Sequence, residues 1–425
     1  MDHPNFMAKL TSITNIPFWI ACILLICGGL VSPIKGLTKN QPEQTLPLDE
    51  LRTFSEVFYY VKSSYVEEVD DKALIKAAIK GMVSSLDNHS RYLDPSAFAA
   101  FTADNDGEYA GIGLSFADHP LGIQIDTVIK NGPADRQKLT KGMVVTHIND
   151  IDIKRISSDD AYKLLYGRIN SKVKLSILES DRLENPDLES HSKSSTSNLK
   201  PPNAKQKDYF LTRETIYLPS ITSDLLPTNI GYLAISQFTK KSPIEFIDAV
   251  NKLSANQPID KLVIDLRNNP GGVLESAIQI SDLFIDSGTL LTSSGRTTEA
   301  NETFHASSIA PYIDLQVVVM MNAYSASSSE ILAAALQDHH KATILGDISY
   351  GKGSIQSIYL LRKEAGLKIT TAKYFSPEGH KIQDVGIKPD VMFKTAGLEN
   401  HQPTEILNDL ELLQAFKILS EKKSQ

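Results

Sequence analysis

The spacing of apolar and polar residues changes along the chain and predicts different structure in different parts. Residues 50–104 repeat apolar side chains at helical spacing, which predicts an N-terminal helical region. Residues 105–180 contain short β-rich runs, glycine turns and one helix near 159–166. From residue 209, buried-strand runs alternate with helices, which predicts an α/β core over 209–398. Core strands are expected at 232–236, 261–266 and 315–322, and core helices at 242–253, 275–284 and 328–338.

The N-terminal segment is apolar, and no charged residue occurs from Leu10 to Ile34. Its apolar core of 16 residues is short for a membrane-spanning helix. It is typical of a signal peptide or a tilted signal anchor at 16–34. No small-residue cleavage signal follows, which favours an uncleaved anchor with residues 1–15 in the cytoplasm and 35–49 as a linker. A buried core helix is the alternative interpretation.

Two further stretches complete the predicted organisation. Residues 181–208 are polar and low in complexity, which predicts a disordered loop at the end of the domain over 105–208. The tail, 399–425, is predicted to contain a closing helix from Glu405 to Leu419.

Composition and charge exclude some classes of function. The 425 residues are enough for about three domains. The net charge is −8 and no basic block occurs, which argues against a nucleic-acid partner. Both cysteines, Cys22 and Cys27, lie in the apolar segment, so the remaining chain has no thiolate nucleophile, disulfide or cysteine metal site. An export signal before a cysteine-free body predicts a bacterial cell-envelope protein on the periplasmic side of the inner membrane, anchored or exported.

Residues 346–354, GDISYGKGS, are close to a phosphate-binding loop. In such a loop, backbone N–H groups and a lysine hold the phosphates, and a following hydroxyl binds magnesium. Here Gly353 follows Lys352, so that hydroxyl is missing. The next residues predict a strand, whereas a phosphate loop opens a helix. A nucleotide-binding enzyme is therefore kept only as an alternative.

Two turns of the predicted core each end a strand and open a helix. Asp265–Gly272, DLRNNPGG, ends in paired glycines that expose backbone N–H groups, which suits an anion or oxyanion site as well as a plain turn. Asn322–Ile331, NAYSASSSEI, places four serines at a helix start. This arrangement fits N-capping, and it also fits the presentation of a nucleophilic serine.

A serine nucleophile needs a base to accept its proton. None of the core histidines lies in a recognisable triad motif; these are His305, His339, His340 and His380. A lysine can serve when burial lowers its pKa from about 10.4 towards 7. Lys352 lies between two glycines, and Gln356 would hold its amine without favouring the charged form. A solvated turn lysine is the alternative interpretation.

Taken in order, these motifs resemble the carboxy-terminal processing proteases, also called tail-specific proteases, which are serine–lysine peptidases with a PDZ domain. Residues 78–93, AIKGMVSSLDNHSRYL, are similar to the family's N-terminal helical signature, and 108–116, EYAGIGLSF, to the start of its PDZ domain. LVIDLRNNPGG, SASSSEILAAALQD and GDISYGKGSIQS are similar to its core motifs, and 374–390 to the segment that closes the core. The resemblance implies an α/β protease core, an N-terminal helical region and an inserted PDZ domain, which is α+β with a partly open β-barrel.

The resemblance also implies roles for individual residues. Ser327 would be the nucleophile, Lys352 the general base and Gln356 the third catalytic member. Positions 352 and 356 of a strand face the same side, so these two side chains are expected to meet. The backbone of Ser328 and of Gly271 or Gly272 would form the oxyanion hole. Glu330 and Asp338 are expected to be structural, and the carboxylate-binding PDZ loop would be Gly111, Ile112, Gly113 and Leu114.

The implied function is a serine endopeptidase that captures the free C-terminus of a protein or peptide, without a metal or other cofactor. The expected partners are this substrate and the inner membrane, with a homo-oligomer or an adaptor protein left open. A catalytically silent PDZ scaffold is the alternative. The sequence departs from the family pattern at Lys138, where glycine is common, at Met143, where aspartate is common, and in the long loop 181–208.

Overall fold

The computed structural model describes residues 46–179, 205–393 and 409–421. The predicted segments 1–15 and 16–34 lie outside these ranges. Contacts divide the chain into two units, one ending at Leu74 and the other beginning at Ile75. Among the helices of the described ranges, none is long and apolar enough to cross a membrane.

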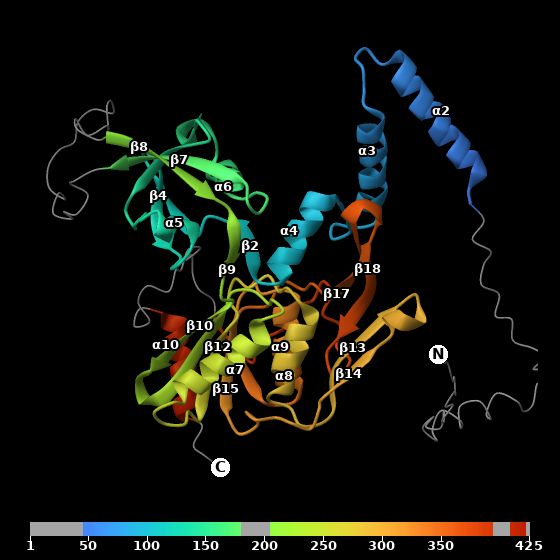
Figure 1. The fold of residues 1–425 in the computed structure, drawn as a ribbon. Helices are drawn as coiled ribbons and strands as arrows, with labels where there is room; N and C mark the ends of the chain where they lie inside the picture. The colour runs from blue at the N-terminus through green and yellow to red at the C-terminus, as the bar shows by residue number, and fades with distance from the viewer. Residues whose placement is uncertain (1–45, 180–204, 394–408, 422–425) are drawn as a thin grey trace, which may run out of the picture. The chain divides into compact units, whose positions relative to one another are not determined.

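Helices occupy most of the predicted helical region 50–104. They are α2 (Leu48–Ser64), α3 (Asp71–Ser84) and α4 (Pro95–Asn105) (Figure 1). Helix α4 begins where Asp94 accepts a hydrogen bond from the backbone of Ala97 at 3.1 Å, with Pro95 in the first turn. The prediction is wrong at Arg91–Leu93, which forms strand β1 and pairs with residues 366–368. A partner so distant in sequence leaves no local signal.

A six-stranded sheet forms the predicted α/β core, in the order β10-β11-β12-β15-β16-β19. Strand β10 is antiparallel to β11, and the other neighbours are parallel. The inner strands are continuous apolar runs because helices bury both faces. The strands are β10 (Ile221–Leu226), β11 (Ile230–Ile235), β12 (Lys261–Asp265), β15 (Gln316–Met321), β16 (Ala342–Gly346) and β19 (Val391–Met392). The helices are α7 (Ser242–Leu253), α8 (Leu274–Asp282), α9 (Ser328–Asp338) and α10 (Leu410–Glu421).

Helix α10 covers the face of this sheet opposite α7, α8 and α9 (Figure 1). Its apolar side chains pack on residues of β12, β15 and β16. At its start, Arg267 forms ion pairs with Asp265 at 2.6 Å, Asp409 at 2.7 Å and Glu411 at 3.1 Å. The predicted closing helix therefore exists, but it begins at Leu410.

A second sheet has the order β1-β18-β13-β14, with β17 also paired to β18. Strand β17 follows the glycine-rich 346–353 segment, as the sequence predicted. The strands of this sheet are β13 (Thr289–Gly295), β14 (Thr303–His305), β17 (Ser354–Leu360) and β18 (Gly366–Phe375). Short 3₁₀ turns occur at Ile153–Arg155, Pro227–Asn229, Thr298–Ala300 and Arg362–Glu364.

Between the helical region and the core lies a module with its own apolar core. Its hydrogen-bonded order is β3-β4-β5-β7-β8, with β6 on β5, and within the described residues it does not close into a barrel. Strand β3 is therefore an edge strand. The elements are β3 (Leu114–His119), β4 (Gly122–Val128), α5 (Pro133–Arg136), β5 (Val144–Ile148), β6 (Ile151–Asp152), α6 (Ser158–Leu165), β7 (Lys172–Glu179) and β8 (Lys205–Thr212).

Strand β8 corrects two predicted boundaries. It begins inside the predicted loop 181–208 and continues past residue 209, where the core was expected to start. Its first four residues are polar, which led to the loop prediction. These residues pair with β7. In addition, Asp208 accepts a hydrogen bond from Ser176 at 2.7 Å and forms an ion pair with Lys174 at 2.8 Å.

A two-stranded ladder, β2 (Glu108–Gly111) with β9 (Glu214–Tyr217), carries the chain into and out of this module. Glu108, the first residue of β2, forms an ion pair with Lys241 of the core at 2.8 Å.

Candidate active site

The four serines of the turn before α9 have different surroundings. Ser325 donates to the carbonyl of Leu266 at 2.8 Å, Ser328 to that of Gly272 at 3.2 Å, and Ser329 to that of Asn269 at 3.0 Å. These three are buried, whereas Ser327 is partly exposed. Ser327 also has a positive φ of 56°, a strained conformation that is often found at functional sites. Three serines therefore stabilise the turn through hydrogen bonds, and Ser327 is left partly exposed.

The predicted glycine turn lies directly against Ser327. A Cβ at Gly271 would lie 2.7 Å from the Ser327 Cβ, so only glycine fits. The Gly271 N–H donates to the side chain of Asn269 at 2.8 Å. Among the described residues, the N–H groups of Gly272 and Ser328 donate no hydrogen bond. Of the two glycines considered for an oxyanion hole, Gly272 is the one with a free donor.

Glu330 joins the serine turn to the lysine turn. Its buried carboxylate accepts hydrogen bonds from the backbone N–H of Ser327 at 2.8 Å and of Lys352 at 2.9 Å, both at Oε2. At Oε1 it accepts from the Gly351 N–H at 2.6 Å and the Ser349 hydroxyl at 2.5 Å. The expectation that Glu330 is structural missed this link. An acid three residues after a helix-capping serine was the available signal.

Lys352 is largely enclosed. Burial lowers the pKa of its amine, because the charged form loses hydration, and the Glu330 carboxylate offsets part of this effect. Burial lowers the pKa of Lys368 and of His89, and the positive charge of the nearby Lys352 lowers each further. No feature of the sequence indicated that Lys368 and His89 approach the lysine.

Tyr374 contacts both turns and was also missed. Its hydroxyl donates to the backbone carbonyl of Lys352 and lies close enough to the Ser327 side chain for this side chain to affect the pKa of the phenol. The side chain is 1% exposed, and burial raises the pKa of its phenol well above the usual value. A neutral phenol therefore lies between the serine and the lysine backbone.

Gln356 does not contact Lys352 as expected from strand alternation. Its amide nitrogen donates to the Ser354 hydroxyl at 3.0 Å and lies 3.4 Å from the Thr370 hydroxyl. Strand β17 begins only at Ser354, so Lys352 lies before the strand. The alternation of side chains on which the expectation rested therefore does not extend to residue 352.

Comparison with known proteins identifies the family of this chain. Residues 229–393 match the family model of peptidase family S41, and 31–97 match that of the activating protease CtpB N-terminal domain. A carboxy-terminal-processing protease of Bartonella bacilliformis is 30% identical over 404 residues, covering 94% of this chain and 87% of the relative. This chain belongs to peptidase family S41, the carboxy-terminal-processing proteases.

Other similar proteins are of the same kind. A Staphylococcus aureus protein (strain N315) described as "Probable CtpA-like serine protease" is 30% identical over 394 residues, covering 92% of this chain and 72% of the relative. The solved structure of a photosystem II D1 C-terminal processing protease is 25% identical and covers 80% of this chain and 86% of its own, with a TM-score of 0.46. The S41 chain is a serine-type peptidase, which contradicts the alternative of a silent scaffold.

The nucleotide alternative also fails on geometry. The segment 346–353 leads into strand β17 rather than a helix. The backbone N–H groups of Gly351 and Lys352, which would cradle phosphates, are already bound to the Glu330 carboxylate. An anionic phosphate would have to approach a buried anion, which is electrostatically unfavourable.

Of the four residues predicted to bind a peptide carboxylate, Gly111, Ile112 and Leu114 line a groove in the S41 chain's middle module. Gly111 ends β2, Ile112 is buried, Gly113 has a φ of 74°, and Leu114 opens β3. The groove has a volume of about 400 Å³. It is lined by Tyr109, Gly111, Ile112, Leu114, Ser115, Phe116, Thr127, Ile129, Leu165, Tyr166 and Leu218.

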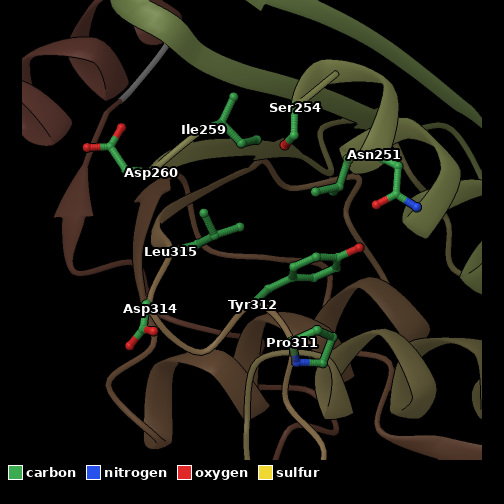
Figure 2. A pocket seen from close by; sticks show the side chains of 9 residues that line it. Asn251, Ser254, Ile259, Asp260, Pro311, Tyr312, Asp314 and Leu315 are labelled. Carbon is green, nitrogen blue, oxygen red and sulfur yellow. The ribbon is translucent and has the colours of Figure 1, made fainter. Parts of the chain in front are cut away.

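A second pocket carries none of the predicted site residues. It has a volume of about 300 Å³ and lies beside the starts of β12 and β15, and Tyr312 and Leu315 extend into it (Figure 2). The serine turn lies beyond the opposite, carboxyl ends of these parallel strands, where α/β folds place their sites.

Asp338, Glu378 and His380 place ligand atoms within 4.8 Å of one another. Asp338 is nevertheless occupied by the loop itself, accepting from the Ser376 hydroxyl at 2.5 Å and the Glu378 N–H at 2.9 Å. This agrees with the structural role expected for Asp338.

Proposed function

We propose that this S41 peptidase cleaves with Ser327 as nucleophile and Lys352 as general base. The observation that carries the proposal is the shared carboxylate of Glu330, which binds the backbone of both residues at one oxygen atom. Burial supplies the remaining requirement, because it lowers the pKa of the lysine amine and so favours the neutral form that can accept a proton.

In the proposed reaction, the Ser327 hydroxyl turns towards the Lys352 amine. Its oxygen attacks the carbonyl carbon of the scissile peptide, and its proton passes to the lysine amine. The Gly272 and Ser328 N–H groups stabilise the oxyanion. The lysinium then protonates the leaving amine as the C–N bond breaks, leaving an acyl-enzyme. Lys352 next takes a proton from water, which hydrolyses the ester and restores the serine. Gln356 would support the lysine only after moving from its present partners.

The pH dependence of cleavage tests the role of Lys352. We expect kcat/KM for an unfolded casein to rise with pH as the lysine loses its proton, and to reach a plateau well below the pH at which an exposed lysine titrates. The unfolded chain keeps this proton to higher pH, so the free energy of unfolding should also rise with pH between the two pKa values. A profile that levels off only at the pKa of a free lysine would contradict the proposal. Substitution of the exposed Lys252 by alanine is the control and should leave the profile unchanged.

We further propose that the middle module is a PDZ domain that binds substrate C-termini by strand addition. The outer edge of β3 has no partner strand among the described residues, and the groove lies between this edge and the end of α6. The adjoining loop from Gly111 to Leu114 would supply backbone donors for a terminal carboxylate. Lys138, the departure from the family's glycine, adopts a φ of 60°, so this turn keeps the conformation that glycine favours.

Tail recognition predicts that a free carboxylate matters for cleavage. An unfolded peptide substrate should show a kcat/KM roughly ten-fold higher than the same peptide with a C-terminal amide, because charge-assisted hydrogen bonds to the loop are lost in the amide. Steady-state cleavage of the two peptides measures this ratio. Equal kcat/KM values for the two peptides would show that the enzyme does not recognise the free carboxylate.

The envelope location remains part of the proposal. It is supported by the uncharged sequence from Leu10 to Ile34 and by the cysteine-free remainder. N-terminal sequencing of the protein recovered from membrane and soluble fractions tests whether the segment is an anchor or a cleaved signal.

A further inference from the structure

The N-terminal helical signature, residues 78–93, contains a loop that one carboxylate orders. Asp87 Oδ1 accepts hydrogen bonds from the backbone N–H groups of His89 and Ser90, both at 2.7 Å. Asp87 Oδ2 accepts from the hydroxyl of the buried Ser90 at 2.8 Å. Because the Ser90 hydroxyl donates to Asp87, the lone pairs of the Ser90 oxygen are directed towards another donor.

That donor is the backbone N–H of Thr370 in β18, which lies 3.1 Å from the Ser90 oxygen. Residues 366–368 of β18 pair with β1, and 372–375 pair with β13. Since β17 occupies one edge of β18, both of these strands lie on the other edge. Among the described residues, 369–371 have no strand partner on that edge. Ser90, which directly precedes β1, therefore takes the place of a strand partner in the gap.

On the opposite edge of β18, Thr370 is the register partner of Gln356 in β17. The pairing is irregular at this point, because the register shifts between Ile355 and Gln356, and such a shift locally disrupts the ladder. The Thr370 hydroxyl also lies 3.4 Å from the amide nitrogen of Gln356. The backbone from which Gln356 extends thus depends on Thr370, and Ser90 fixes Thr370 where the ladder is weakest.

We propose that Asp87 and Ser90 are positioning residues for Gln356. They hold Thr370 from the far edge of β18, and thereby fix the backbone point from which the Gln356 side chain reaches the lysine during cleavage. The inference rests on the proposed role of Gln356 as the third catalytic member. Neither residue touches the substrate or a reacting atom. Without them Thr370 loses its acceptor, and Gln356 occupies its productive position for a smaller fraction of the time.

The substitution Ser90→Ala tests the proposal, because it removes the acceptor of the Thr370 N–H. We expect kcat for an unfolded casein to fall about ten-fold with KM unchanged, since the alignment of reacting groups is impaired and substrate binding is not. Steady-state cleavage at a series of casein concentrations separates the two quantities, and circular dichroism checks that the protein is folded.

Two further variants accompany this one. Asp87→Asn places an amide NH2 group against the loop N–H groups or the Ser90 hydroxyl, and it should lower kcat about three-fold. It keeps the test open if Ser90→Ala does not fold. The matched control is Ser85→Ala in the same signature, where an exposed hydroxyl donates to the Met82 carbonyl at 2.8 Å. This control should change neither kcat nor KM.

A double variant distinguishes positioning from a general loss of stability. If Ser90 acts through Gln356, adding Ser90→Ala to Gln356→Ala should lower kcat by less than about two-fold beyond Gln356→Ala alone. A loss of stability would instead lower kcat by the same factor in both backgrounds. Asp87→Asn can replace Ser90→Ala in this comparison.

The outcomes separate this inference from the proposed function. A loss of kcat that persists undiminished in the Gln356→Ala background would overturn the positioning role and leave the Ser327–Lys352 mechanism intact. Wild-type kcat in every folded variant of Asp87 and Ser90 would have the same meaning. Wild-type kcat in Gln356→Ala alone would overturn the proposed role of Gln356, and this inference with it.

Discussion

Replacement of Ser327 by alanine is expected to abolish cleavage of an unfolded casein, with kcat falling by roughly four orders of magnitude or more. The reason is that the other serines of the turn are hydrogen-bonded to backbone carbonyls and cannot replace it. Lys352→Ala should have an effect of similar size, since the proposed mechanism assigns no other base to the Ser327 hydroxyl. Because the two residues act as a unit, the double variant should be no worse than either single one.

Initial rates of casein cleavage, measured with a metal chelator present, check this expectation. Alanine at Ser287, an exposed serine that ends no strand and opens no helix, is the matched control and should retain full activity. Circular dichroism should show that each variant is folded. Undiminished cleavage by a folded Ser327→Ala or Lys352→Ala protein would overturn the assigned roles.

Removal of the Glu330 carboxylate is expected to damage both stability and activity. Glu330→Ala leaves three backbone N–H groups without their acceptor in a buried site. We expect the free energy of unfolding to fall by about 4 kcal/mol, because each buried unsatisfied donor is costly. We also expect kcat to fall about 100-fold or more in the protein that remains folded, because the serine and lysine turns lose their common anchor.

Glu330→Gln sharpens the test, since it keeps the volume but replaces one acceptor oxygen by an amide NH2 group that faces N–H donors. Urea unfolding should place it between wild type and Glu330→Ala. Glu302→Gln, at an exposed carboxylate, is the control and should change neither quantity. Wild-type kcat in a destabilised Glu330→Ala protein would show that the carboxylate supports the fold without positioning the reacting groups.

Much of the α/β core could be predicted from the sequence. Helices α7 and α9 begin and end at the predicted residues, because their apolar spacing and capping residues are local signals. The buried strands β12 and β15 were predicted for the same reason, being runs of Val, Ile, Leu and Met between turn residues. Errors occurred where a strand depends on a distant partner, as in β1, or begins with polar residues, as in β8.

The site was predicted less evenly. Motif order and resemblance singled out Ser327, Lys352 and the glycine turn. They gave no indication that Tyr374 contacts the first two of these, or that Lys368 lies near the lysine. Among the described residues no hydrogen bond joins Gln356 to Lys352, because Lys352 lies before the first residue of β17, where strand alternation does not apply.

Most of the elements, and the residue types that carry the chemistry, can be read from the chain, since helix periodicity, turn glycines and capping residues act over a few positions. Which polar groups are satisfied and which remain free depends instead on how the chain packs. Glu330 binds the turns of Ser327 and Lys352, and Asn269 occupies the Gly271 N–H. Each of these depends on side chains and backbone brought together by packing, and on burial, which alone sets the cost of an unpaired charge or donor.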